Sequence, residues 1–333
     1  MTFPDDAAER RAAAAAGAHY RLCRCTDEAE TARAVRGADV VLVNFAPVTE
    51  AVLAAMAPGA TVVRYGIGVD NVDLDAAARR GVRVANVPDY GSDTVADHAA
   101  ALLLSLLRRL PEYHGVIAGG GWGAPSDLAP VRALSATTVG LVGTGRIGRA
   151  LAARLIPFGV TVLGHDPYAD PAELAAAGIR VRPLDEVLRR SHAISLHAPA
   201  TPETHHLIDR DALARLPWGA VLVNTARGSL VETAAVVEAL REGRLAGAGL
   251  DVVEEEPLPA DSELRTLPNV QLTPHAAFYS EQSVRRLQEL AADEARRALL
   301  GEPLRSPVAL PEPGPGDRPP AGTRTRPPTR PPA

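Results

Sequence analysis

The chain of 333 residues is poor in cysteine and in aromatic side chains. It has 2 cysteines, and aromatic residues make up 4% of it. Cys23 and Cys25 alternate along HYRLCRC, a segment that we expect to be a strand, where they would point to opposite faces. Because there is also no CxxC motif and no cluster of cysteine with histidine, no metal site is implied. Reduced thiols of a cytoplasmic protein are the simplest interpretation.

A surplus of positive charge and long apolar runs are also missing. The formal net charge of -5 supplies no basic surface, so binding to nucleic acid has no electrostatic support. No apolar run reaches the roughly 18 residues that a membrane span needs. The first residues, MTFPDDAAERR, do not form the basic and then apolar pattern of a signal peptide. We therefore expect a cytoplasmic protein without a nucleic-acid or membrane partner.

What the sequence does contain is an alternation of short apolar runs with helical patterns. This alternation is typical of α/β folds whose parallel sheets carry helices on both faces, and the length favours two domains at about 150 residues each. We expect helices over 73–80, 95–110, 148–157, 171–177, 184–190, 209–213, 232–242 and 281–300. Strands are expected in the runs DVVLVNF, ATVVRYG, VRVANV, TTVGLVG, VTVLGHD, HAISLHA, GAVLVNTA, GAGLDVV and NVQLTPH.

Two segments differ from this pattern. Behind Ser92, Asp93 and Thr94, which can cap it, the predicted helix 95–110 is apolar nearly all round, as expected of an element packed between domains or subunits. Residues 312–333 are so rich in proline and polar residues that we expect a disordered tail. A proline-rich ligand for a partner module is the less favoured alternative for this tail.

A glycine-rich motif, GTGRIG, lies between a predicted strand and a predicted helix. Gly143 permits the tight turn, Gly145 lets a pyrophosphate approach the backbone, and Gly148 lets the helix lie close to the sheet. The N–H groups at Arg146 and Ile147, with the helix dipole, then favour phosphate. The motif therefore predicts a dinucleotide site.

An acidic residue, Asp166, ends the next predicted strand about twenty residues on. A carboxylate at this position binds ribose hydroxyls and repels a 2'-phosphate, which favours NAD over NADP. Arg149, which is close in sequence to the motif, leaves NADP open as an alternative. The other interpretation of Asp166 is an ordinary turn residue before Pro167.

Three chemically suited side chains follow later strands: Arg227, Glu256 and His275. Arginine offers a fork that matches a carboxylate, and histidine exchanges protons near neutral pH when a carboxylate orients it. Singly, each has an ordinary interpretation, as a strand cap, a member of an exposed acidic run and a loop histidine. Together, at the strand ends where open α/β sheets bind ligands, they indicate reduction of a 2-oxo acid.

Several segments resemble the D-isomer-specific 2-hydroxyacid dehydrogenases. They are NTARG, DVVEEEP and TPHAA, with YGIGVDNVD, NVPDYGSDTVADHAA and SLHAPATPETHHLI, so the resemblance extends over about 38–307. HAAFYSEQ is most similar to the C-terminal-binding-protein-like branch, although Phe278 stands where that branch often has tryptophan. The resemblance implies that Arg227 binds substrate, that Glu256 (the glutamate directly before Pro257) is the histidine partner, and that His275 is the general acid/base.

The resemblance also implies further binding positions. The loop from Tyr65 to Val69 would present backbone N–H groups to the substrate carboxylate, which explains its two glycines. The substrate-binding residues would be Tyr65, Gly66, Ile67, Gly68 and Arg227. Besides the glycine-rich motif and Asp166, the NAD-binding residues would be Thr94, His197, Ala198, Pro199, Thr204, Thr225, Ala226, Arg227, Asp251, His275 and Ala277.

The family organisation predicts an NAD domain over 99–278 inserted into a substrate domain made of 1–98 and 279–311, with the active site in the cleft between them. Family members usually begin with a strand that this sequence lacks, so we expect the given start to be truncated. The implied function is NAD-dependent interconversion of a small D-2-hydroxy acid and its 2-oxo acid by a homodimer joined through the NAD domains. The alternatives are an NAD(H)-sensing regulatory protein and an enzyme acting on another small anion, such as formate or phosphite.

Overall fold

The computed structural model describes residues 3, 5–123 and 130–312, which form two compact units. One unit is built from the residues up to Tyr90 together with those from Val284, and the other is Gly91–Ser283. The second unit therefore interrupts the first in sequence, with ends at 91 and 283 where we had predicted 99 and 278. The predicted disordered tail lies outside the described residues except for Glu312.

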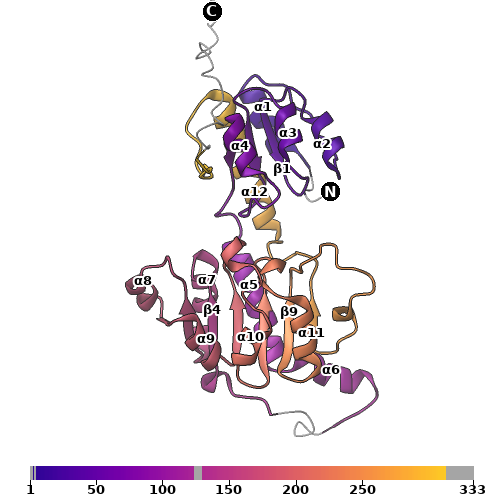
Figure 1. Cartoon of the computed structure of the whole chain (residues 1–333), viewed down its shortest axis with the longest axis vertical. Coiled ribbons are helices and arrows are strands. Elements are labelled where there is room, and N and C mark those ends of the chain that lie inside the picture. The colour runs from indigo at the N-terminus through magenta and orange to yellow at the C-terminus, as the bar shows by residue number, and fades with distance from the viewer. Residues whose placement is uncertain (1–2, 4, 124–129, 313–333) are drawn as a thin grey trace, which may run out of the picture. The chain divides into compact units, whose positions relative to one another are not determined.

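The unit Gly91–Ser283 is built on a seven-stranded sheet in the order β10-β9-β8-β7-β4-β5-β6, with every neighbouring pair parallel (Figure 1). The central strands β7 and β8 are buried along their whole length, as apolar runs covered on both faces should be. The predicted parallel α/β fold is thus confirmed. The strands are β4 Thr138–Val142, β5 Thr161–His165, β6 Ile179–Val181, β7 Ala193–Leu196, β8 Ala220–Asn224, β9 Leu245–Leu250 and β10 Val270–Leu272.

Helices cover both faces of this sheet, and each face has its own apolar core. Leu188, Leu213 and Val236 belong to one core, whereas Leu103 and Leu151 belong to the other. The edge strand β6 has only three residues and escaped prediction, as did α6. The helices are α5 Ser92–Leu107, α6 Leu110–Ala118, α7 Arg146–Leu155, α8 Pro171–Ala176, α9 Leu184–Arg190, α10 Arg210–Arg215 and α11 Thr233–Arg241.

Helix α5 packs within its own unit and corrects one expectation. Its apolar surface lies against α7, β8 and β9. Gly249 of β9 allows this close packing, since a Cβ there would lie 3.1 Å from the Cβ of Leu102. The helix begins at Ser92 behind Gly91 with no side-chain cap, so Ser92, Asp93 and Thr94 lie in its first turn instead of capping it.

The other unit has a three-stranded parallel sheet in the order β1-β2-β3, made of β1 Val40–Val43, β2 Thr61–Arg64 and β3 Arg83–Ala85. After the last helix the chain returns antiparallel beside β3, where Val308 donates a backbone hydrogen bond to Val84. The helices are α1 Ala7–Ala15, α2 Glu28–Ala34, α3 Glu50–Ala55, α4 Leu74–Arg80 and α12 Glu281–Leu300, of which the part from Val284 belongs to this unit.

The segment around the two cysteines is not a strand. Residues 18–26 have no regular secondary structure, and both Cys23 and Cys25 are free thiols, so the predicted strand is wrong. Its alternating pattern lacks what a strand requires, which is a neighbouring strand to accept its backbone hydrogen bonds. Within the described part of the chain, no helix is both long and apolar enough to cross a bilayer.

Candidate functional site

The glycine-rich turn lies where β4 meets β7, the point at which the strand order reverses and open α/β sheets bind ligands. Gly143 has a φ of 89°, and a Cβ there would lie 2.6 Å from the backbone nitrogen of Ala198. A Cβ on Gly148 would lie 2.5 Å from the carbonyl oxygen of Gly143. Gly145 differs, because a Cβ on it would meet nothing within 4 Å. Gly143 and Gly148 are therefore needed for packing. Gly145 leaves open the space at the start of α7 that a pyrophosphate requires.

Asp166 follows β5 and lies beside the glycine-rich turn. Its Oδ2 accepts hydrogen bonds from the backbone N–H (2.8 Å) and the hydroxyl (3.1 Å) of Thr144, and its Oδ1 accepts one from the N–H of Tyr168 (3.0 Å). Burial alone would raise the pKa of this carboxyl, but these hydrogen bonds lower it below its ordinary value, so the group is ionised at neutral pH. Asp166 therefore shapes the turn and also leaves a negative charge beside the motif.

Arg149, the residue that kept NADP open, has an acidic partner. Its Nη1 lies 3.6 Å from Oε2 of Glu173 at the start of α8. A guanidinium that already faces a carboxylate is a weaker binder for a 2'-phosphate than one without such a neighbour. The charges around Asp166 thus favour NAD.

His275 and Glu256, which are 19 residues apart, are in direct contact. The distance from His275 Nδ1 to Glu256 Oε2 is 2.8 Å. Burial opposes ionisation of Glu256, but the hydrogen bond and charge of His275, with help from the charge of Arg227, lower the pKa of Glu256 below its ordinary value. The three residues follow β10, β9 and β8, which are neighbours in the sheet, so the parallel order brings them to one edge.

The neighbouring glutamates show why only one of the three can partner His275. The carboxylate of Glu254 contacts Nε2 of His206 at 2.6 Å and accepts the N–H of Thr233 at 2.7 Å, at the start of α11. Glu255 is exposed. In the structure, Glu256, the glutamate directly before Pro257, is the partner of His275. Glu254 belongs to a second histidine–glutamate pair.

Comparison with known proteins decides the family. Residues 100–277 match the family model described as D-isomer specific 2-hydroxyacid dehydrogenase, NAD binding domain. A D-3-phosphoglycerate dehydrogenase of Mycobacterium leprae is 41% identical over 83% of this chain and 52% of its own length. A glyoxylate reductase of Korarchaeum cryptofilum is 37% identical over 85% of this chain and 88% of its own. The chain belongs to the D-isomer-specific 2-hydroxyacid dehydrogenase family.

A solved structure of the same family shows the cofactor that goes with this domain. A D-lactate dehydrogenase from Aquifex aeolicus, complexed with NAD and lactic acid, is 32% identical with a TM-score of 0.76, over 83% of this chain and 88% of that one. Because residues 100–277 of this chain match the NAD-binding domain of the family, the chain carries such a domain, with NAD as its cofactor. It spans about half the length of the D-3-phosphoglycerate dehydrogenases that it matches. The comparisons lend no support to the regulatory alternative, and similarity to the C-terminal-binding-protein-like branch stays a prediction.

The other residues predicted from the family to bind NAD have different local environments. Among the described residues, the buried hydroxyl of Thr225 has no hydrogen-bond partner, which suits a polar group of the cofactor. The Thr204 hydroxyl donates to the carbonyl of Pro199 at 2.7 Å and so shapes the loop after β7. Burial lowers the pKa of His197 to about 4, so its ring is neutral at physiological pH. Thr94 Oγ1 lies 3.2 Å from Ser280 Oγ.

Asp251, which the family resemblance placed near NAD, has a second use. Its buried carboxylate accepts hydrogen bonds from the Thr273 hydroxyl at 2.5 Å and from the N–H groups of Ala276 and Ala277 at 2.8 and 2.9 Å. Its carbonyl accepts the N–H of His275 at 2.8 Å. Asp251 thus holds the loop that carries His275, which has the left-handed φ of 51°.

Two supporting residues were missed in the sequence. Asn224 ends β8 fully buried, accepts the N–H of Ala226 at 3.0 Å and donates to the carbonyl of Arg227 at 2.8 Å. Thr273 contacts both Asp251 and Nε2 of His98, the latter at 3.0 Å. In the sequence, each of these is a polar residue at the end of an apolar run. Such a residue looks the same as an ordinary loop residue when only the sequence is known.

In the other unit, the loop from Tyr65 to Val69 follows β2. The N–H of Tyr65 donates to Val43 and that of Gly66 to the carbonyl of Arg64, and the Tyr65 hydroxyl lies 2.6 Å from Oε1 of Glu9. In the described ranges, the N–H groups of Ile67 and Gly68 have no acceptor. The predicted anion donors of this loop therefore narrow from four residues to these two.

Proposed function

We propose that this chain is an NAD-dependent dehydrogenase that interconverts a small D-2-hydroxy acid and its 2-oxo acid. The observation that carries the proposal is the 2.8 Å contact of His275 Nδ1 with Glu256 Oε2, at the same edge of the sheet as the glycine-rich turn. NAD, when bound, accepts or supplies the hydride. The side chains of the protein then have to bind the acid and move one proton.

The geometry supports a division of labour among the three side chains. With its Nδ1–H donating to ionised Glu256, His275 has Nε2 as the nitrogen that exchanges a proton. During reduction the imidazolium gives that proton to the substrate oxygen and becomes neutral, and during oxidation the neutral ring takes the hydroxyl proton back. Glu256 orients the ring, and the planar guanidinium of Arg227 suits the substrate carboxylate.

The experiment is a substrate panel assayed by nicotinamide absorbance. The named relatives point to glyoxylate, pyruvate (the oxo acid of lactate) and 3-phosphohydroxypyruvate (that of 3-phosphoglycerate) as first substrates with NADH. We expect turnover of at least one of them, and no oxidation of formate or phosphite with NAD. Binding of NADH without turnover of any 2-oxo acid would contradict the proposal.

We also propose that two copies join through their NAD-binding units, by way of α6. None of the residues of α6 is buried, although Leu110, Val116 and Ile117 are apolar and are 55%, 37% and 49% exposed. Apolar side chains that gather on the exposed surface of a helix usually mark a protein interface. We take a second copy of the chain as the partner, since the family resemblance implies a homodimer joined through the NAD domains.

A further inference from the structure

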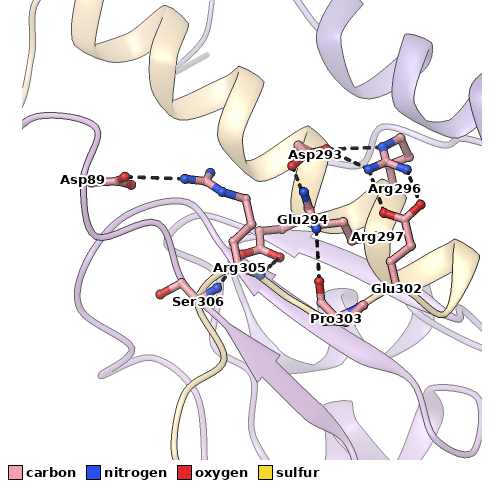
Figure 2. Close-up of polar contacts among 9 residues, drawn as sticks. All are labelled: Asp89, Asp293, Glu294, Arg296, Arg297, Glu302, Pro303, Arg305 and Ser306. Carbon is pink, nitrogen blue, oxygen red and sulfur yellow. Dashed lines mark hydrogen bonds and ion pairs between the residues drawn. The ribbon is translucent and has the colours of Figure 1, made fainter.

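The segment after α12 is tied to that helix by carboxylates (Figure 2). Glu294, only 1% exposed, accepts the backbone N–H of Arg305 on Oε2 at 3.0 Å and that of Ser306 on Oε1 at 2.7 Å. Hydrogen bonds to a buried charged acceptor are stronger than neutral ones, and breaking them would leave the charge unsatisfied. Glu294 therefore holds Ser306 firmly in place.

Ser306 in turn contacts Asn86, the residue directly after β3. The hydroxyl of Ser306 lies 2.7 Å from Oδ1 of Asn86, and the backbone N–H of Asn86 donates to the carbonyl of Ser306 at 3.2 Å. Because the amide oxygen of Asn86 accepts from Ser306, its NH2 group is turned the other way. That group donates to the carbonyl of Ile67 at 2.6 Å.

The carbonyls of the loop after β2 are thus held from the end of β3. Asn86 Nδ2 binds the oxygen of Ile67, and the backbone N–H of Val87 binds the oxygen of Gly66 at 2.9 Å. In a planar trans peptide the C=O and the following N–H point in opposite directions. Fixing these two oxygens toward β3 therefore directs the N–H groups of Ile67 and Gly68 away from it.

Those two N–H groups are adjacent donors for which the described residues provide no acceptor. Successive backbone N–H groups that point the same way form an anion-binding concavity. Gly66 makes the turn possible, since its φ is 132° and a Cβ there would lie 1.7 Å from Nη1 of Arg64. The concavity depends on the carbonyl anchors just described.

We propose that Asn86 and Ser306, held by Glu294, are positioning residues that orient the N–H groups of Ile67 and Gly68 toward the substrate carboxylate. This inference rests on the proposed function for the identity of the anion, but the anchoring itself does not. Neither residue is catalytic. Their loss should weaken binding of the 2-oxo acid while leaving the proton transfer at His275 and the binding of NADH unchanged.

The kinetic test uses the whole chain with glyoxylate and NADH. We expect Asn86→Ala and Ser306→Ala to raise the KM for glyoxylate about tenfold, as the loss of an anchoring hydrogen bond should, with kcat and the KM for NADH nearly constant. Ser306→Thr keeps the hydroxyl and should restore the KM. The control is Glu302→Gln, on the same segment, which breaks the ion pair to Arg296 without touching Asn86. An equal rise in KM for Glu302→Gln, or none for Asn86→Ala, would overturn the proposal.

Hydrogen–deuterium exchange separates this inference from the proposed function. The backbone amide of Val87, which donates to the carbonyl of Gly66, should exchange faster in Asn86→Ala than in the wild type, whereas the amide of Gly143, which donates to His165, should not change. If no 2-oxo acid is turned over and the Val87 amide still responds, the proposed function fails and the anchoring is upheld. If exchange at Val87 is unaffected, the anchoring is wrong whatever the activity.

Discussion

At the scale of single residues, the described part of the chain has two histidine–glutamate pairs whose glutamates are only two residues apart. His275 contacts Glu256 and His206 contacts Glu254, at 2.8 and 2.6 Å. Contact with a carboxylate is therefore not what distinguishes the proposed acid/base. What distinguishes His275 is its position: it follows β10, the strand next to the one that Glu256 follows. In the other pair, the carboxylate of Glu254 is shared between His206 and a backbone N–H at the start of α11.

Replacing each histidine tests this distinction. We expect His275→Ala to lower kcat by about 10² or more, the usual contribution of a general acid/base, with NADH affinity nearly intact. His206→Ala is the matched control and should keep most of kcat. Steady-state rates and NADH titrations measure both. An equal loss in the two variants, or none in His275→Ala, would refute the assignment.

The preference for NAD can be tested at Asp166. Removing its charge in Asp166→Asn, or the whole side chain in Asp166→Ala, should narrow the ratio of the NADP and NAD dissociation constants by about tenfold, the value of one ribose hydrogen bond and its charge. Asp170→Ala removes a nearby carboxylate that caps α8 and should leave the ratio as it is. Titration of each variant with NAD and with NADP measures the two dissociation constants. If their ratio is unchanged in the Asp166 variants, the ribose contact lies elsewhere.

At the scale of elements, the C-terminal end of α12 is stabilised by a group of ion pairs (Figure 2). Arg296 binds both oxygens of Glu302 at 2.9 Å and also contacts Asp293, which accepts from Arg297 at 2.8 Å. The hydrogen bond from Arg296 lowers the pKa of Glu302. For Asp293 burial acts to raise the pKa, but both arginines outweigh it. These pairs stabilise the end of the helix, whereas Ser306 is held separately by Glu294.

This group predicts how stability depends on pH. A carboxyl whose pKa is lower in the folded state stabilises the protein fully above its unfolded pKa, and that contribution is lost as the pH falls through the folded pKa. Wild type should therefore melt above Glu302→Gln at neutral pH, and the difference should shrink as the pH drops below the ordinary value of 4.5. Thermal melts of both proteins across this range provide the measurement. A difference that stays constant into acid would show that Glu302 stabilises by other means.

At the scale of the whole molecule, the proposed pairing of copies concerns α6. Val116→Glu with Ile117→Glu places two charges on the apolar surface and should turn a dimer into monomers. Trp218→Ser, which removes an apolar side chain that is 68% exposed elsewhere, is the control and should leave the dimer intact. Light scattering after size exclusion reads the mass directly. A monomeric wild type, or a dimer in both variants, would exclude α6 as the interface.

Periodicity and turn chemistry in the sequence determined most of the fold. Strand-length apolar runs predicted nine of the ten strands found in the described residues. Glycine marked the ends of helices, as Gly81 does after α4 with its left-handed φ of 64°. The features that the sequence did not predict depend on neighbouring elements. The run around Cys23 alternates like a strand but pairs with no strand among the described residues, and the apolar side of α5 is buried because α7, β8 and β9 pack against it. Such properties are decided by partners distant in the chain, which local patterns do not reveal.

The same division holds for the site. Residue type and position at strand ends pointed to Gly143, Asp166, Arg227 and His275, whereas Glu256 was chosen among three consecutive glutamates by the resemblance to the family. Only the tertiary structure decided which groups are already engaged: the N–H of Tyr65 by β1, the carboxylate of Asp251 by the loop of His275, and the carbonyl of Ile67 by Asn86. A hydrogen bond satisfied by a residue far along the chain leaves no local trace, so the supports of the site emerge only when the chain is folded.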